Sequence, residues 1–245
     1  MPLDSLIVFL GSLSGGFVSG LAGFGTGLVA LGIWLHVIDP KLAATLVLAC
    51  SVVSQSQTIP YVWHAVDRRR VGPFILGGLA GVPVGAALVA YLAPEALKLW
   101  VGLLLVGFSA FMLSGRPRRP IAWGGRAADT AVGFAGGLMG GLAGLSGPPP
   151  IIWATLRKWT RDQRRAVFQA YNLSILFAAL IAHAAAGLVT VELARLFLVA
   201  VPGTLGGAWL GARLYRRLSD RRFDQLVLSL LLLSGLLLVW SSLAR

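Results

Sequence analysis

The chain has 245 residues, of which 57% are hydrophobic and only 12% are charged, and its mean hydropathy is +0.81. Soluble domains carry about 25% charged residues, and the net charge of +12 here comes from short basic clusters between long apolar runs. This pattern is typical of chains that span a lipid bilayer, and it excludes a soluble enzyme, a nucleic-acid-binding module and a disordered tail. The first apolar run has no basic region before it, so we expect no cleaved signal peptide.

The apolar segments form two series of four in chain order. The first series covers residues 3–35, 42–63, 71–92 and 96–113. The second covers residues 130–156, 166–187, 191–214 and 223–243. Because a bilayer core needs about 20 helical residues, the last three segments of each series are predicted to be ordinary transmembrane helices. We therefore expect an all-α integral membrane protein.

The first segment of each series is predicted to be a broken helix. Residues 23–27 read Gly-Phe-Gly-Thr-Gly, and residues 144–150 read Gly-Leu-Ser-Gly-Pro-Pro-Pro. A glycine costs about 1 kcal/mol in a helix and a proline about 3 kcal/mol, so the helix should stop at both places. A new helix is expected to begin around Leu28 in the first half and within 148–151 in the second.

An internal duplication explains why the two breaks correspond. The sequence Gly-Leu-Ala-Gly begins at Gly20 and again at Gly141, an offset of 121 residues, which places Ser51 opposite Asn172. Further along, residues 203–208 resemble residues 81–86. We interpret residues 1–114 as one transmembrane repeat, 115–128 as a cytoplasmic linker, and 129–245 as the second repeat.

The placement of charge predicts how the repeats cross the membrane. The basic clusters lie at residues 68–70, 116–126, 157–165 and 213–222. If all eight segments simply cross, these clusters fall on both faces, against the positive-inside tendency. If each broken segment is a re-entrant hairpin, each half crosses three times, the second half is inverted, and all four clusters share one face. This hypothesis places the basic loops in the cytoplasm and both termini outside; eight plain spans remain the alternative.

The two breaks are also the candidate substrate site, because matching interruptions in two halves indicate a transporter's binding site. A helix start attracts anions through its positive dipole end and unpaired N–H groups. Polar residues on the next helix of each half could complete the site: Ser51, Gln55 and Thr58 follow i, i+4, i+7 spacing, as do Arg165, Gln169 and Asn172. Helix–helix hydrogen bonding is the alternative role for them. The predicted substrate-binding residues are Gly25, Thr26, Gly27, Ser51, Gln55, Ser146, Gly147, Gln169 and Asn172.

The scarcity of charged residues within the spans and of cysteines argues against a cation site and a metal site. In this interpretation no Asp, Glu, Lys or Arg lies well inside a span, which disfavours a cation pump. The single cysteine, Cys50, cannot form a multi-cysteine metal site. We therefore expect a small anion as the ligand, with no metal and no cofactor.

The glycine-rich break that opens each half, the prolines after the second break, and the segment Gly206–Leu214 resemble the TauE/SafE family of sulfite exporter-like membrane proteins. This resemblance implies a secondary transporter in the inner membrane that moves sulfite, organosulfonates or related sulfur-containing anions. Inverted repeats favour alternating access. The partners then expected are the small anion, the bilayer, a coupling ion (proton or sodium) and a second copy in a homodimer, with no nucleic acid.

Two alternative functions are retained at this point. A passive anion channel could be built on the same scaffold. Ser146 within Gly-Leu-Ser-Gly, together with His183, also resembles the serine–histidine pair of rhomboid proteases. His183, however, falls about 28 Å along its helix from residue 164 at 1.5 Å per residue, near the opposite face from the basic loops. We therefore do not expect an enzyme.

Overall fold

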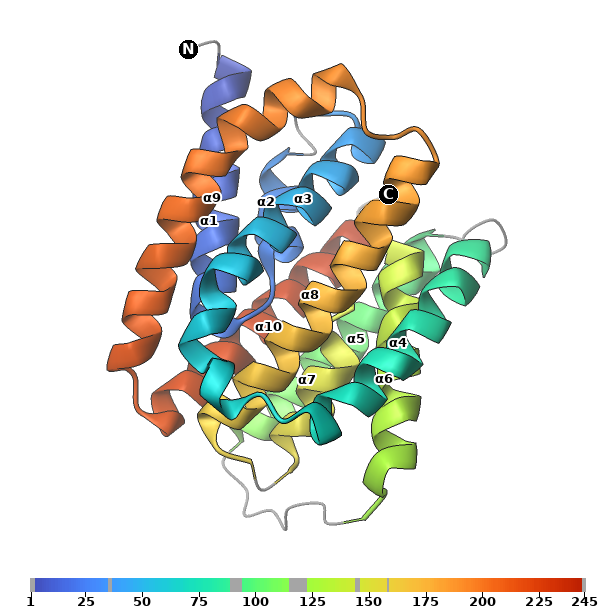
Figure 1. Ribbon diagram of the computed structural model, residues 1–245, viewed down its shortest axis with the longest axis vertical. Helices are drawn as coiled ribbons and strands as arrows, with labels where there is room; N and C mark the ends of the chain where they lie inside the picture. The colour runs from blue at the N-terminus through green and yellow to red at the C-terminus, as the bar shows by residue number, and fades with distance from the viewer. Residues whose placement is uncertain are drawn as a thin grey trace.

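Helices form nearly all of the structure (Figure 1). The computed structural model describes residues 3–34, 37–88, 94–114, 123–143, 146–157 and 159–243. Gly144 and Leu145 of the second break and residues 115–122 of the predicted linker lie outside these ranges. The helices of the first half are α1 (Leu3–Ala22), α2 (Thr26–Trp34), α3 (Pro40–Thr58), the 3-10 helix η1 (Ile59–Ala65), α4 (Arg68–Leu88) and α5 (Pro94–Leu113). Those of the second are α6 (Gly125–Ala143), α7 (Pro148–Thr155), α8 (Arg161–Ala185), α9 (Val191–Arg217) and α10 (Asp220–Leu243).

Five helical stretches among the described residues are long and apolar enough to cross a membrane. They are Leu3–Ala22, Leu42–Ala65, Arg161–Ala185, Val191–Arg217 and Arg221–Ser242. Several large apolar side chains at the surface are largely exposed, such as Trp240 on α10 and Leu198 on α9, at 74% and 73%. A soluble protein rarely presents so much apolar surface, and the fold is that of an all-α membrane protein.

The first broken segment folds back on itself as a helical hairpin. α1 runs to Ala22, the chain turns at Gly23 and Gly25, which have φ values of +83° and +96°, and α2 returns alongside α1. At the far end of α2, the indole N–H of Trp34 donates a 3.0 Å hydrogen bond to the Val8 carbonyl. α2 has 9 residues, about 14 Å at 1.5 Å per residue, which is too short to cross a bilayer.

The second broken segment makes the same kind of hairpin from α6 and α7. The indole N–H of Trp153 donates a 2.7 Å hydrogen bond to Asp129 on α6, and Arg157 forms a 3.0 Å ion pair with the same carboxylate. Asp129 follows Val8 by the 121-residue offset of the repeat, so the two acceptors are at equivalent positions, whereas Trp153 lies two residues before the counterpart of Trp34. With 8 residues, α7 cannot span a membrane either. This geometry supports the hairpin hypothesis over eight plain spans.

Each hairpin packs against a helix of the other half. α1 lies parallel to α9, and α6 lies parallel to α4, with glycines at both contacts. A methyl group added at Gly207 would overlap the Leu13 carbonyl, and one added at Gly81 would overlap the Phe134 carbonyl. Without a Cβ at these positions the helix backbones approach closely, as in the small-residue contacts of membrane helices.

The register of these contacts corrects the sequence alignment of the third segments by one helical turn. The series Gly203, Gly207 and Gly211 faces Phe9, Leu13 and Phe17 in turn, and the series Gly77, Gly81 and Gly85 faces Thr130, Phe134 and Leu138. Since Phe9 and Thr130 are 121 residues apart, Gly203 corresponds in packing to Gly77. The match of residues 203–208 to 81–86 was therefore wrong by four residues. A glycine at every fourth position makes both registers look alike in sequence.

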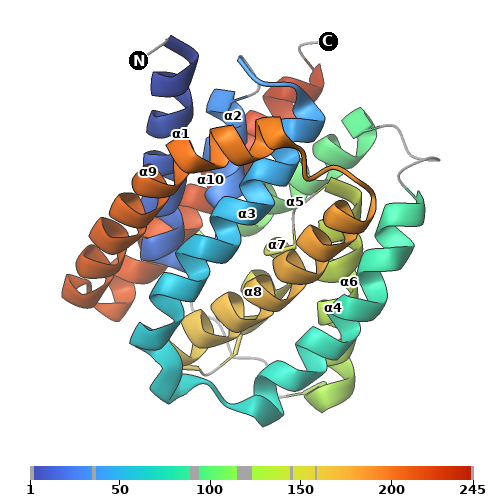
Figure 2. The ribbon, with the colours of Figure 1, turned by 45° about the horizontal axis from the view of Figure 1, so that its top comes forward.

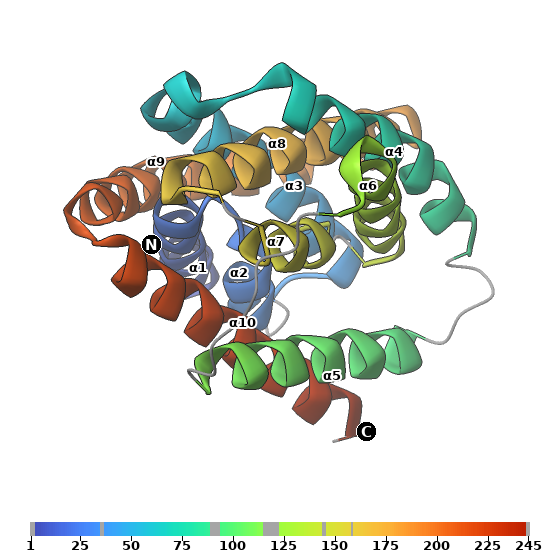
Figure 3. The same cartoon turned by 90° about the horizontal axis from the view of Figure 1, so that it is seen from below.

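α3 and α8 run antiparallel through the centre of the molecule (Figure 2). Thr45 on α3 and His183 on α8 share a 2.9 Å hydrogen bond near one end, and Gln169 donates to the Gln55 carbonyl at 3.0 Å nearer the other. Seen from below, α2 and α7 lie between this layer and the pair α5 and α10 (Figure 3). The two short helices are thus enclosed by long ones.

The described arginine clusters gather at one end of the molecule, the lower end in Figure 1. Arg70 at the start of α4 lies 5.6 Å from the Trp159 ring, and Arg161 at the start of α8 donates to the carbonyl of Leu218, just after α9. α1 begins and α10 ends near the opposite end. We call the first of these the arginine-rich end. That it faces the cytoplasm stays a prediction.

Candidate functional site

A cavity lies where the two breaks meet the two central helices. It is lined by Phe24, Gly25, Thr26, Gly27, Val47, Ser51, Gln55, Ser146, Gly147, Pro148, Asn172 and Leu176. Eight of the nine residues predicted from the sequence line it. No side chain in this lining carries a charge. Its volume is about 40 Å³, measured as space open to the centre of a water molecule. One water needs about 10–15 Å³ on this measure, so the cavity suits a small ligand.

The first helix start at the cavity belongs to α2. The helix begins at Thr26, two residues before the predicted start at Leu28, because Gly25 adopts a positive φ that ends the preceding turn. Backbone N–H groups in the first turn of a helix have no partner within the helix. Thr26 and Gly27 therefore bring backbone donors and the positive end of the helix dipole to the cavity wall.

The second helix start is chemically different. α7 begins at Pro148 as predicted, after Gly147, which caps it without a side-chain hydrogen bond. Residues 148–150 are all proline and have no N–H group. The sequence argument for unpaired N–H donors therefore fails for this first turn, although its dipole remains. Hydrogen bonds on this side of the cavity must come from the backbone of Ser146 and Gly147 and from side chains.

Two polar atoms at the cavity have no hydrogen-bond partner among the residues that the structure describes. Thr26 Oγ1 and Gln55 Oε1 are buried and make no hydrogen bond, and each residue is only 1% exposed. An unsatisfied buried polar group costs about 1–3 kcal/mol, so such groups in a native structure call for a functional explanation. A ligand in the cavity could accept a hydrogen bond from the Thr26 hydroxyl or donate one to it, and it could donate one to Gln55 Oε1. This is the most specific sign that the cavity is a binding site.

Ser146 and Asn172 form a direct link across the cavity wall. The Ser146 hydroxyl donates to Asn172 Oδ1 at 2.9 Å, and both residues are buried. His183 instead bonds to Thr45 and follows Asn172 by eleven residues on α8, about 16 Å along the helix. A nucleophile and its base must lie within about 3 Å of each other. The geometry thus contradicts a Ser146–His183 protease pair.

Gln169 is the predicted site residue that does not line the cavity. Its side chain is fully buried between α3 and α8, where Nε2 donates to the Gln55 carbonyl and to Thr58 Oγ1. The alternative role, helix–helix hydrogen bonding, describes this arrangement. Four apolar lining residues were missed: Phe24, Val47, Pro148 and Leu176. Phe24 and Pro148 lie inside the breaks and could have been included; Val47 and Leu176 look like any other residue of an apolar helix.

Arg165 lies in a helix and not in the basic loop to which the sequence assigned it. It was assigned to a basic loop at 157–165, but α8 already begins at Arg161, and Arg165 is 0% exposed. A capping box between Thr160 and Gln163 places the helix start before it. Within the described part of the chain, no group of three or more His, Cys, Asp or Glu side chains gathers as a metal ion would require.

Comparison with known protein families identifies the family of this chain. Residues 7–238 match the family described as sulfite exporter TauE/SafE. The chain belongs to this family. With its long apolar helices, the chain is a multi-pass membrane protein of the TauE/SafE family.

A curated relative of this TauE/SafE protein is the probable sulfite/organosulfonate exporter TauE of Cupriavidus necator. The two are 29% identical over 162 residues, which is 62% of this chain. The match spans 60% of the relative's length. No solved structure matches the chain.

Proposed function

We propose that this protein exports sulfite or a similar small sulfur-containing anion across the inner membrane as a secondary transporter. The observation that carries the proposal is the cavity between the two breaks, with its two helix starts and its two unpartnered polar atoms. The relative's name supplies the substrate class, sulfite and organosulfonates. The nine predicted residues are proposed to serve it, eight as the cavity wall and Gln169 by holding α3 and α8 together.

The chemistry of the wall supports an anion. The N-terminal end of a helix favours negative charge. The lining also has amide and hydroxyl groups but no carboxylate that would repel an anion. The volume of the cavity supports a small anion, because about 40 Å³ holds roughly three water-sized groups. Sulfite, with four heavy atoms, suits this space. An organosulfonate with a carbon chain needs a wider conformation of the same cavity.

The packing supports alternating access. Each hairpin is joined to a helix of the other half through a glycine contact, α1 to α9 and α6 to α4. These pairs can move as units around α3 and α8, and rocking of units about a central site is the usual mechanism for repeats of this kind. We propose inverted halves, each a hairpin followed by three spans, with the arginine-rich end in the cytoplasm and a proton or sodium ion as the coupling ion.

Binding is tested first, by thermal denaturation of the purified protein in detergent with sulfite, sulfate, thiosulfate, organosulfonates, matched carboxylates and chloride. A ligand at 100 times its Kd stabilises the folded state by about 2.7 kcal/mol. We expect sulfite to raise the melting temperature and its carboxylate analogue to leave it unchanged. No shift with any anion would contradict the proposal.

Transport is tested in liposomes containing the protein. A carrier saturates with sulfite concentration and shows counterflow, in which unlabelled sulfite inside drives uptake of labelled sulfite. Flux that does not saturate and shows no counterflow would instead identify a passive anion channel. Cys50→Ala makes the chain cysteine-free, and a cysteine then placed at Ser51 reports which face opens to the cavity.

A further inference from the structure

We propose that Arg165 is a second anion-binding residue, which takes the small oxyanion as it passes between the central cavity and the arginine-rich end. This inference rests on the proposed transport function. It assigns to the transport path an anion-binding residue that does not line the central cavity.

Arg165 carries a buried charge that no described carboxylate contacts directly; Asp162, hydrogen-bonded to Tyr215, stabilises it only from further away. It is 0% exposed, and among the residues that the structure describes no carboxylate oxygen lies within 4 Å of its guanidinium. Burying a charge without a carboxylate in direct contact is unfavourable, and ionisable groups kept inside membrane proteins commonly mark substrate pathways. A purely structural role would be served better by a neutral side chain.

The guanidinium has donors to spare. Nη2 donates to the Gly20 carbonyl at 2.5 Å, and the Tyr215 ring lies 3.7 Å from the guanidinium carbon. Nε and Nη1 make no hydrogen bond to any of the described residues. Adjacent guanidinium N–H groups bind oxyanions in a bidentate manner. Sulfite and the head of a sulfonate both present the paired oxygens that such a donor set binds.

Arg165 is also joined to the cavity by position. It shares a face of α8 with Gln169 and Asn172, and Asn172 lines the cavity seven residues further on, about 10 Å along the helix. Its side-chain stem contacts Gly23 at the first break, where an added Cβ would lie 3.2 Å from Arg165 Cγ. An anion that leaves the cavity toward the arginine-rich end thus meets Arg165 directly beyond the Gln169 layer.

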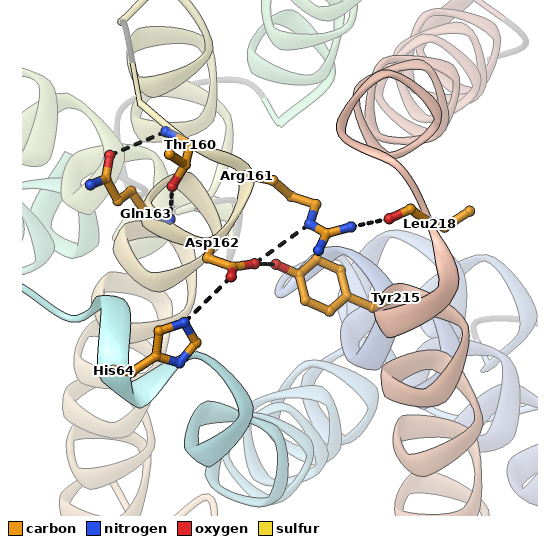
Figure 4. Close-up of polar contacts among 7 residues, drawn as sticks. All are labelled: His64, Thr160, Arg161, Asp162, Gln163, Tyr215 and Leu218. Carbon is orange, nitrogen blue, oxygen red and sulfur yellow. Dashed lines mark hydrogen bonds and ion pairs between the residues drawn. The ribbon is translucent and has the colours of Figure 1, made fainter.

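A cluster of polar contacts covers this position in the present conformation (Figure 4). Asp162 accepts a hydrogen bond from the Tyr215 hydroxyl and lies 3.4 Å from His64 and 3.5 Å from Arg161. These contacts connect α8, α9 and the end of η1, and they hold the Tyr215 ring over Arg165. We call Asp162, Tyr215, Arg161 and His64 the latch. Its opening would expose the spare donors of Arg165 to the arginine-rich end.

The test compares sulfite transport from the two faces. Inside-out vesicles present the proposed cytoplasmic face, and right-side-out vesicles present the other. We expect Arg165→Gln to raise the KM for sulfite at least about tenfold in inside-out vesicles, the loss expected for hydrogen bonds to a charged group, with a smaller change in right-side-out vesicles. Arg165→Lys should fall between, because it keeps the charge and loses the bidentate geometry.

Arg164→Gln is the matched control, because it removes the same charge at the neighbouring buried position on another face of α8; its KM should match that of the wild type. An Arg165→Gln KM that is unchanged, or equally changed on both faces, would overturn the inference. Should wild-type protein transport no sulfite, the proposed function fails instead.

A measurement on the wild-type protein keeps the inference testable if the variants do not fold. Phenylglyoxal modifies accessible arginines, and peptide mass spectrometry reads each site. We expect Arg165 to be modified slowly as the latch opens, and sulfite to slow that reaction without affecting the exposed Arg216. Failure of sulfite to protect Arg165, or no modification of it at all, would contradict the proposed role.

Discussion

The side chains of Ser146 and Asn172 are joined by a 2.9 Å hydrogen bond that ties the second break to the central helix α8. Because the hydroxyl of Ser146 occupies Asn172 Oδ1, the amide nitrogen of Asn172 is the end that remains to donate to a ligand. The serine that resembles a protease nucleophile thus orients a donor at the cavity wall.

Replacing Asn172 should therefore weaken sulfite binding without unfolding the protein. We expect Asn172→Ala to lower sulfite affinity about tenfold, as for the loss of a charge-assisted hydrogen bond, and Asn172→Asp to lower it further through charge repulsion. Titrated thermal shifts measure both. Ser174→Ala, on the same helix and bonded to the Ala170 carbonyl, should bind like the wild type; if Asn172→Ala also binds like the wild type, Asn172 is not part of the site.

The unpartnered hydroxyl of Thr26 predicts opposite effects on stability and binding. Thr26→Val keeps the shape of the side chain and removes an unsatisfied polar atom. Without ligand, the free energy of unfolding should therefore stay the same or rise by up to about 1–3 kcal/mol, and the melting temperature should stay the same or rise with it. The stabilisation by sulfite should fall at the same time.

Thr58→Val is the control for this prediction. Thr58 Oγ1 donates to the Ser54 carbonyl at 2.8 Å and accepts from Gln169, so its loss leaves Gln169 without that partner. The free energy of unfolding should fall by about 1–3 kcal/mol, and the melting temperature should drop accordingly. If both threonine variants destabilise the protein equally, Thr26 has a partner that the cavity interpretation does not include.

The glycine contacts between hairpins and partner helices predict a sharp positional effect. Gly207→Ala should destabilise the protein by about 1–3 kcal/mol, the usual cost of overpacking, because the new methyl group overlaps the Leu13 carbonyl. Gly107→Ala on α5 has nothing within 4 Å of the added Cβ and should gain up to about 1 kcal/mol from helix propensity. Thermal denaturation in detergent separates the two; similar melting temperatures would argue against close packing of α1 and α9.

The latch predicts how Arg165 becomes accessible. Tyr215→Phe keeps the ring over Arg165 and loses the hydrogen bond to Asp162, so phenylglyoxal should modify Arg165 severalfold faster. A hydrogen bond to a charged group is worth about 1.5–3 kcal/mol. His64→Ala removes a contact whose histidine side chain is 67% exposed, and exposed pairs contribute little, so its rate should stay near that of the wild type. Equal rates in all three proteins would mean that the latch does not cover Arg165.

The orientation of the halves is tested with reporter fusions. A fluorescent protein that folds only in the cytoplasm should be dark when fused after α10 and bright when inserted in the linker between α5 and α6. A bright fusion after α10 would contradict three crossings per half and restore an even number of spans.

Local chemistry explains why much of this protein could be predicted without its structure. Clustered glycines weaken a helix locally, and α1 and α6 end at Ala22 and Ala143, next to the breaks expected at residues 23–27 and 144–150. Single prolines such as Pro83 and Pro202 are instead tolerated inside α4 and α9. The duplication then marked which polar residues correspond, and eight of the nine predicted residues lie around one cavity.

Other features depend on contacts between distant segments, and only the tertiary structure decides them. Tyr215 lies 50 residues from Arg165 in the chain. Its ring packs against the Arg165 guanidinium, so an arginine that the sequence assigned to a loop is buried. Gln169 lies one turn from the cavity because α3 and α8 cross at that level. The register of Gly203 against α1 follows from backbone contact at every fourth residue. The sequence by itself determined where helices break and that they lie in a membrane, since both follow from local composition. Which polar groups face the cavity and which hold helices together was decided by packing, because that choice depends on what lies opposite each side chain.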